Sequence, residues 1–204
     1  MKQNIDQSTD VDVKENILDA TTELIRESNG DLSRVTIRNI AHKADVSIGL
    51  INYHFKSKER LIEICVERII KQVIHSFKFN QGVNDVPKDR LLSGATSVFA
   101  FLKENPEIAK VSILSDLSSP HMNTNSVTCY RGILNILPDN FSEEKRKVVA
   151  FILLSVIQSA FLTRTVTNDL LDFNLYTDEG VHSFLKYIID LLFAPEIIHN
   201  RIRR

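Results

Sequence analysis

Cysteine and glycine are scarce in this sequence, and each shortage excludes a class of protein. Two of the 204 residues are cysteines, Cys65 and Cys129, which are too few for a disulfide framework and have no metal-ligand spacing. We expect both to be reduced thiols in a core. The six glycines border no segment of alternating polarity, so no strand is predicted and an all-α fold is expected.

Excess charge and long apolar runs are also missing. The formal net charge is −1, which argues against a generally basic surface, so any DNA contact must be local. Residues 1–12 are polar and acidic, without the apolar run of a secretory signal. Apolar stretches elsewhere are interrupted before the roughly 18 residues that a membrane helix needs. We expect a soluble, cytoplasmic protein with no membrane partner.

No residue pattern for catalysis or metal binding is present. His42 and His54 fall on different predicted helices, with no Cys or carboxylate at ligand spacing around either. There is no glycine-rich phosphate loop after a strand and no Gly-x-Ser-x-Gly nucleophile motif. The sequence therefore predicts no metal, no cofactor and no enzymatic activity. A small helical enzyme stays an alternative that turnover on any substrate would support.

The stretch from Thr36 to Lys58 begins with a short predicted helix. Apolar residues recur at positions i, i+3, i+4 and i+7, which places a single apolar stripe on one face: Ile37, Ile40, Ala41 and Ala44. Thr36 is the expected N-cap. Asp45 tolerates the left-handed conformation of a tight turn, and Val46 follows it as a buried anchor.

A second short helix is predicted from Ile48 to Phe55, with Ser47 as its N-cap. Ile51 and Phe55 would be buried, while the other side carries a mixture that suits no core: Ile48, Gly49, Asn52, Tyr53 and His54. Two short helices across a tight turn, the second with polar and aromatic groups facing solvent, are typical of a helix-turn-helix whose second helix reads the major groove. The alternative is an ordinary helical hairpin.

Basic residues are concentrated around this motif. Between Ser33 and Arg60 the net charge is +4, from Arg34, Arg38, Lys43, Lys56, Lys58 and Arg60 against Asp45 and Glu59. A charge run is usually a solvated face. Combined with a helix-turn-helix, this charge lies where DNA phosphates would sit.

The segment resembles the DNA-binding domain of the TetR family of bacterial transcriptional regulators. The resemblance extends from Val13 to Leu61 and is carried by Thr36, Ile40, Ala41, Ala44, Val46, Ser47, Gly49, Tyr53, His54, Phe55, Lys58 and Leu61. The chain departs from the family pattern at Asp45, where glycine is usual, and at Asn52, where tyrosine is frequent. The remainder is similar only in length and helical content.

The resemblance implies that Thr36, Ser47 and Lys58 bind phosphates. From its position one turn into the first helix, we expect Arg38 to reach a guanine edge, and Asn52 could read adenine in the same bidentate way. Ile48 and Leu50 are expected to meet thymine methyl groups, and Tyr53 and His54 the backbone. Gly49 either lets the helix approach the groove closely or is only a spacer.

The rest of the chain is predicted to be helical. After Ser57, a long helix should run to about Phe79, followed by a loop over 80–88 and helices at 89–105, 107–117, 123–137, 142–171 and 178–193. The run Val148–Ile157 is apolar nearly all round, so a second subunit should cover it. Expected dimer residues on this helix and the last one are Phe151, Leu154, Ile157, Phe184, Ile188 and Leu191, in the four-helix interface that the resemblance also implies.

A ligand pocket in the body is the least determined prediction. Candidate lining residues are Phe99, Met122, Tyr130, Ser155, Gln158, Ser159 and Phe161, although plain core packing is the preferred explanation for each. Gln158 and Ser159 interrupt an apolar helix, so each should bond to a ligand, a partner subunit or a backbone carbonyl.

The domain organisation expected is a flexible arm (1–12), a three-helix helix-turn-helix DNA-binding domain (13–60), a helical ligand-binding and dimerisation domain (61–194) and a tail (195–204). The predicted function is a homodimeric transcriptional repressor that leaves a palindromic DNA operator when a small-molecule effector binds. An alternative is a helical protein-interaction module with a vestigial DNA-binding head.

Overall fold

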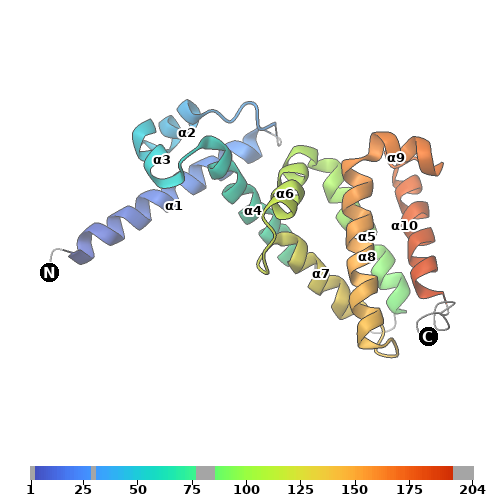
Figure 1. Cartoon of the computed structure of the whole chain (residues 1–204). Coiled ribbons are helices and arrows are strands. Elements are labelled where there is room, and N and C mark those ends of the chain that lie inside the picture. Colours follow the sequence, from blue (N-terminus) through green and yellow to red (C-terminus); the bar gives the residue numbers. More distant parts are fainter. Residues whose placement is uncertain (1–2, 29–30, 77–85, 195–204) are drawn as a thin grey trace. The chain divides into compact units, whose positions relative to one another are not determined.

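The computed structural model describes residues 3–28, 31–76 and 86–194, which form ten helices and no strand (Figure 1). The all-α prediction is therefore confirmed. These residues divide into two compact units. The head unit comprises the described residues up to Ser76 together with Asn105–Asn125, and the body unit comprises residues 86–104 and those from Ser126 onward.

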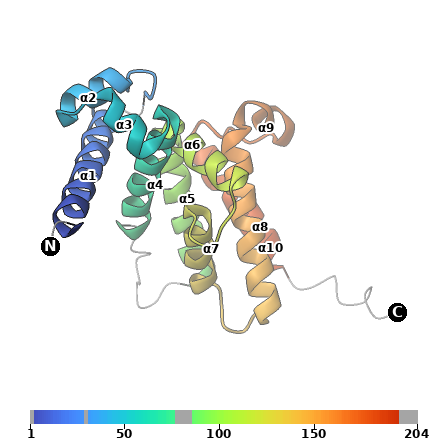
Figure 2. The ribbon, with the colours of Figure 1, turned by 60° about the vertical axis from the view of Figure 1, so that its left-hand side comes forward.

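The head unit is built from five helices: α1 (Gln3–Glu27), α2 (Ile37–Ala44), α3 (Ile48–Phe55), α4 (Lys58–Ser76) and α6 (Pro106–Ser118). Helix α1 packs on α2 and α4, and α4 packs on α6. In Figure 2, α2 and α3 lie at the upper end of α1. The core between them is apolar, with Ile17, Ile25, Val35, Ile40, Ile51, Leu61 and Val66 almost inaccessible to solvent. The sequence had assigned α4 and α6 to the regulatory domain, whereas they cluster with the helix-turn-helix.

Helix α1 begins earlier than expected. The prediction of a flexible arm is wrong for residues 3–12, which continue the helix that was expected to start at Val13. Gln3–Asp12 contains neither proline nor glycine, so nothing in it interrupts a helix. Further along α1, Glu15 and Asp19 pair with Arg68 of α4 at 3.1 and 3.7 Å, which attaches the helix to the rest of the head unit.

The body unit contains α5 (Pro87–Glu104), α7 (Asn125–Ile136, whose first residue belongs to the head unit), α8 (Glu143–Leu162), α9 (Arg164–Leu171) and α10 (Asp178–Phe193). Helices α5, α8 and α10 lie side by side (Figure 1). Lys103 pairs with Asp178 and Lys88 with Asp190, each at 2.6 Å, so α5 and α10 run antiparallel with an ion pair near either end.

The segment expected as one helix over 142–171 is divided. Helices α8 and α9 meet at Thr163 with a bend of 106°. Thr163 Oγ1 bonds back to the Ser159 carbonyl at 2.7 Å, and the residues that follow it are rich in β-branched side chains, both of which weaken a continuing helix. Among the described residues, no single helix is long and apolar enough to span a membrane; only this bent pair meets that test of length and composition.

Several predicted segments lie outside the described residues: the end of the long helix (77–79), most of the loop that follows (80–85) and the tail (195–204). Where the structure does describe the chain, the loop predicted to end at Lys88 is shorter, because α5 already begins at Pro87. Proline is well suited to the first turn of a helix, since its missing N–H has no partner there in any case. The last helix has the predicted bounds, with Thr177 as its N-cap.

Candidate nucleic-acid interface

Helix α2 forms as the sequence predicts. The Thr36 side chain accepts a hydrogen bond from the Asn39 N–H at 3.2 Å, which caps the helix, and Ile40, Ala41 and Ala44 are buried. At the other end, Asn16 of α1 donates from Nδ2 to the Ala44 carbonyl at 2.8 Å. The helix is thus fixed at both ends.

The turn after α2 is a Schellman motif centred on Asp45. Asp45 is left-handed, with φ 52° and ψ 47°. Its N–H donates to the His42 carbonyl at 3.3 Å, and the Val46 N–H donates to the Ala41 carbonyl at 3.0 Å. Aspartate stands where glycine is the commonest residue, and it tolerates this conformation better than most side chains. Val46, expected as a buried anchor, is only half-buried.

Helix α3 buries one side and exposes the other. The Ser47 side chain caps it by accepting from the Leu50 N–H at 3.2 Å, and Ile51 and Phe55 are buried as predicted. Tyr53 is 68% exposed and Ile48 39%, Gly49 and Asn52 are exposed, and Leu50 and His54 are half-buried. The Tyr53 ring meets His54 edge-on, with centroids 5.1 Å apart. An apolar and aromatic face left exposed on a capped helix is unusual for an ordinary hairpin.

Gly49 is not required by the packing of the chain itself. A Cβ built at this position would meet only the Ser47 hydroxyl oxygen, at an ordinary contact distance of 3.7 Å. Glycine weakens a helix relative to alanine. Nothing in the described part of the chain therefore explains the residue, which favours the interpretation that something outside the protein must come close.

A strained turn joins α3 to α4. Lys56 has φ 70° and ψ −47°, and the Ser57 N–H donates to the Phe55 carbonyl at 2.8 Å, which is a γ-turn with positive φ. The Ser57 side chain then accepts from the Arg60 N–H at 3.1 Å and caps α4. The half-buried Lys58 is the first residue of α4, so its charge lies at the helix end where backbone N–H groups are free to bind anions.

Ion pairs occupy half of the predicted basic cluster. Lys43 bonds to Glu27 at 2.7 Å and Glu23 at 3.1 Å, and these bonds raise its pKa. Arg34 pairs with Asp31 at 3.2 Å, and Arg60 with Glu63 at 2.9 Å. The net charge of +4 did not include these carboxylates, because they lie outside the range of residues over which that charge was counted.

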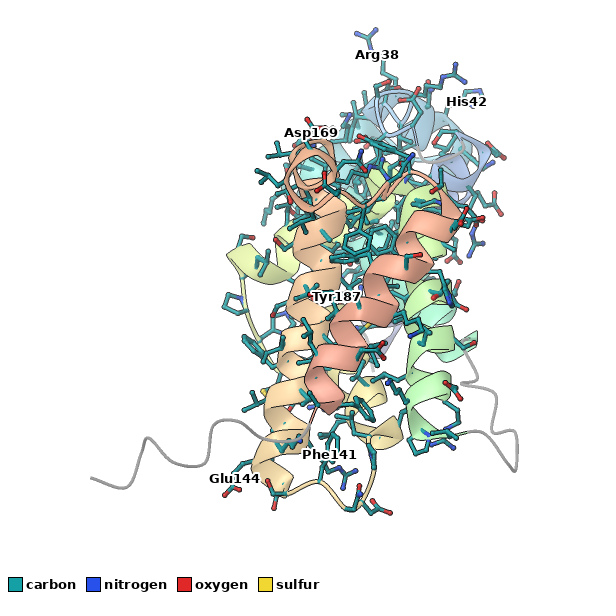
Figure 3. The ribbon with its side chains drawn as sticks, turned by 90° about the vertical axis from the view of Figure 1, so that its right-hand side faces the viewer. Arg38, His42, Phe141, Glu144, Asp169 and Tyr187 are labelled. Carbon is teal, nitrogen blue, oxygen red and sulfur yellow. The ribbon has the colours of Figure 1, made fainter. Side chains whose placement is uncertain are left out.

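Three cations of the basic cluster remain available to bind a partner. In the part of the chain that the structure describes, Arg38, Lys56 and Lys58 form no ion pair. Figure 3 shows the Arg38 side chain extending away from the ribbon, with His42 one helical turn further along α2. His42 is exposed and was not among the predicted contacts, although its i+4 spacing from Arg38 could have indicated it.

The architecture is shared with solved regulators of several bacteria. A TetR-family transcriptional regulator from Rhodococcus sp. matches with a TM-score of 0.56 and 17% identity, covering 89% of this chain and 98% of its own. A TetR from Streptomyces coelicolor matches with a TM-score of 0.55 and 18% identity, covering 87% and 94%. A TetR variant from Acinetobacter baumannii in complex with minocycline matches at 0.53 and 15%, covering 86% and 91%. No curated protein matches the chain significantly.

The family profile described as bacterial regulatory proteins, tetR family, matches residues 17–65, from the buried part of α1 to Cys65 in α4. This segment of the chain is therefore a DNA-binding domain of the TetR type, and the rest of the chain shares the fold of the solved regulators. The matched residues are those that build the capped α2 and α3.

The predicted pocket residues differ in burial and are divided between the two units. Phe99 and Phe161 are buried in the body core, whereas Met122 is 68% exposed and lies in the head unit. Tyr130 is half-buried, and Ser155 and Ser159 are exposed within the single chain, so burial does not require a partner for Ser159. Gln158 donates from Nε2 to Ser126 Oγ on α7 at 2.8 Å, a partner that was not among the alternatives.

The predicted dimer residues separate into two sets. Ile157 and Phe184 are each only 2% exposed within the single chain, so they are core residues and cannot face a partner. Their position on apolar helices did not reveal which side faces the chain's own core. Phe151 and Leu191 are exposed, and Leu154 and Ile188 are half-buried.

Proposed function

We propose that this TetR-family regulator is a homodimeric repressor that binds a palindromic operator through α2 and α3 and is released by a small molecule. The observation that carries the proposal is the face of α3 formed by Ile48, Asn52 and Tyr53, which stays exposed while Ile51 and Phe55 on the same helix are buried. It would act in the cytoplasm by binding rather than by catalysis.

Base reading is assigned to the exposed side chains. Arg38 would donate two hydrogen bonds to a guanine edge and Asn52 would bond adenine, since both geometries are bidentate. Ile48 and the half-buried Leu50 would contact thymine methyl groups. Gly49 would allow the helix to lie close to the base edges, because the packing of the chain gives no other reason for it.

Phosphate binding is assigned to the helix starts and the open cations. Thr36, Ser47 and Lys58 stand at the starts of α2, α3 and α4, where free N–H groups favour an anion. Tyr53 and His54 would contact the backbone. These contacts fix the register without reading sequence.

An apolar surface on α8 and α10 would form the dimer. Phe151 is 65% and Leu191 57% exposed, and Val148, Ile152 and Tyr187 are also exposed on the same two helices. In Figure 3 Tyr187 lies on the side of α10 that faces the viewer, next to α8. A contiguous apolar surface of this kind needs a cover, and a second copy would supply the same two helices.

Release would follow from a change in the distance between two recognition helices. These must lie about 34–36 Å apart to enter successive major grooves. Helix α4 carries Lys58 at its start and packs on both α3 and α6, so a ligand that moves α6 would move the phosphate contact. The minocycline complex of the Acinetobacter TetR is a precedent for a small-molecule effector in a similar fold.

Fluorescence anisotropy on DNA from the protein's own promoter tests the proposal. With six to eight phosphates neutralised by a dimer, affinity should fall roughly 10³-fold or more between about 50 and 200 mM salt. Arg38→Ala should relax base preference at one position at a cost of about 1–3 kcal/mol, whereas Lys58→Ala should weaken every sequence alike. Lack of binding to any promoter fragment, or identical behaviour of the two variants, would contradict the assignment.

A further inference from the structure

Lys14 of α1 is a cation that none of the assigned DNA contacts uses. It is exposed and forms no ion pair with the residues that the structure describes. The neighbouring carboxylates of Glu15 and Asp19 pair instead with Arg68 of α4, at 3.1 and 3.7 Å. The charge of Lys14 is therefore available to a partner outside the chain.

Lys14 lies on the side of α1 that faces the helix-turn-helix. It precedes Ile17 and Leu18 by one helical turn, and both of these residues are buried in the core of the head unit. Its Nζ lies 6.0 Å from the centroid of the ring of Phe55, which is the last residue of α3. The ammonium group is thus placed at the C-terminal end of α3, where the turn at Lys56 begins.

The two ends of α3 differ in how they can hold a phosphate. The start of a helix offers free N–H groups and a partial positive charge, whereas its end presents carbonyl groups and a partial negative charge. Eight helical residues span about 12 Å, which is close to the width of the major groove, so a phosphate strand borders each end of an inserted helix. At the carbonyl end of α3, side-chain cations must therefore supply the attraction.

We propose that Lys14 of α1 binds a DNA phosphate at the C-terminal end of α3, next to the phosphate contact of Lys56. A lysine is a flexible point charge, so this contact positions the DNA without reading its sequence. The inference rests on the proposed DNA interface and adds α1 to the helices that hold the DNA. Lys14 precedes residues 17–65, which the family profile matches, so the profile does not supply this contact.

A purely structural role for Lys14 predicts a different result. A lysine beside the carbonyl end of a helix stabilises that helix through the same partial charge, without any contact to DNA. Removal of the charge would then lower the unfolding temperature and leave the salt dependence of DNA binding unchanged. The salt dependence separates the two roles, because it reports how many phosphates the protein neutralises.

Fluorescence anisotropy titrations of the full-length protein at several salt concentrations test the proposal, on a promoter duplex and on an unrelated duplex of equal length. We expect Lys14→Gln to reduce the salt slope by about one per subunit and to weaken binding to both duplexes by the same factor. For a dimer, the affinity of this variant should fall roughly tenfold less than that of the wild type between about 50 and 200 mM salt. Lys14→Arg keeps the charge and should behave as the wild type.

Lys110→Gln is the matched control. Lys110 is exposed on α6 and forms no ion pair with the described residues, and its replacement changes the net charge of the protein equally. Its salt slope should equal that of the wild type. Thermal unfolding of each variant shows whether the fold is retained.

The proposal is overturned if Lys14→Gln keeps the wild-type salt slope, or if Lys110→Gln lowers the slope equally. A wild-type protein that binds both duplexes with equal affinity would refute the proposed operator recognition, and a lower slope for Lys14→Gln would still support the phosphate contact. A wild-type protein that binds neither duplex at low salt would overturn both.

Discussion

The Ser57 N–H donates to the Phe55 carbonyl across 2.8 Å, and this short loop of backbone sets Lys56 at φ 70°. The γ-turn ends α3 and allows Ser57 to cap α4 directly, so the recognition helix and the helix that begins with Lys58 are separated by only two residues. A positive φ in a residue other than glycine costs about 1–3 kcal/mol. Lysine is therefore present at a position whose positive φ favours glycine.

Replacing Lys56 by glycine should increase stability and weaken DNA binding. We expect Lys56→Gly to raise the free energy of unfolding by about 1 kcal/mol, because glycine adopts positive φ without strain. It should also weaken DNA binding and reduce the salt slope by about one, because a phosphate contact is lost. Thermal unfolding and anisotropy titrations at several salt concentrations measure the two effects. Lys56→Arg, which keeps both charge and strain, is the control and should change neither.

Gly49→Ala should have opposite effects on folding and on binding. The added methyl group has room inside the protein, so we expect a gain of about 0.5–1 kcal/mol in unfolding free energy. If the helix lies close to the base edges, the same methyl group should weaken operator binding. A stabilised variant with unchanged affinity would show that Gly49 is only a spacer.

Phe151→Glu should convert the dimer into a monomer. A carboxylate placed in an apolar interface would be desolvated without a partner, which is strongly unfavourable. Light scattering coupled to size-exclusion chromatography reports the mass. The control is Leu117→Glu, since Leu117 is 62% exposed on α6 and is not part of the proposed surface. A dimer that survives Phe151→Glu would argue for a different interface.

Cys65 should be inert in the folded protein and should make stability depend on alkaline pH. Burial raises the pKa of its thiol from 9.0 to about 11. Because the folded state holds the proton more tightly, the thiol's contribution to stability is present below about pH 9 and is lost as the pH rises toward 11. In a Cys129→Ala background, iodoacetamide labelling at pH 8 should be slow and should accelerate only on unfolding. Rapid labelling of the native protein would contradict the burial of Cys65.

Local interactions explain why the helix-turn-helix could be predicted so closely from the sequence. Thr36 and Ser47 each cap the helix that begins one residue later, and Asp45 takes the left-handed turn between them. These features depend on a few neighbouring residues, so spacing and residue type are sufficient to locate them. The same holds for α10, whose start is set by Thr177.

Contacts between residues distant in sequence could not be predicted in this way. Lys43 was counted as a DNA-facing cation, but Glu23 and Glu27 reach it from α1, a different helix of the head unit. Ile157 and Phe184 were assigned to a partner, but the packing of α5, α8 and α10 buries them within one chain. The apolar character of a residue does not by itself determine which surface will cover it.

The sequence by itself determined the helix-turn-helix, its caps and the resemblance of that segment to the TetR family, because each depends on residues close together along the chain. Only the tertiary structure decided which cations stay unpaired and which apolar side chains stay exposed. These depend on side chains that meet only after helices distant in sequence have packed.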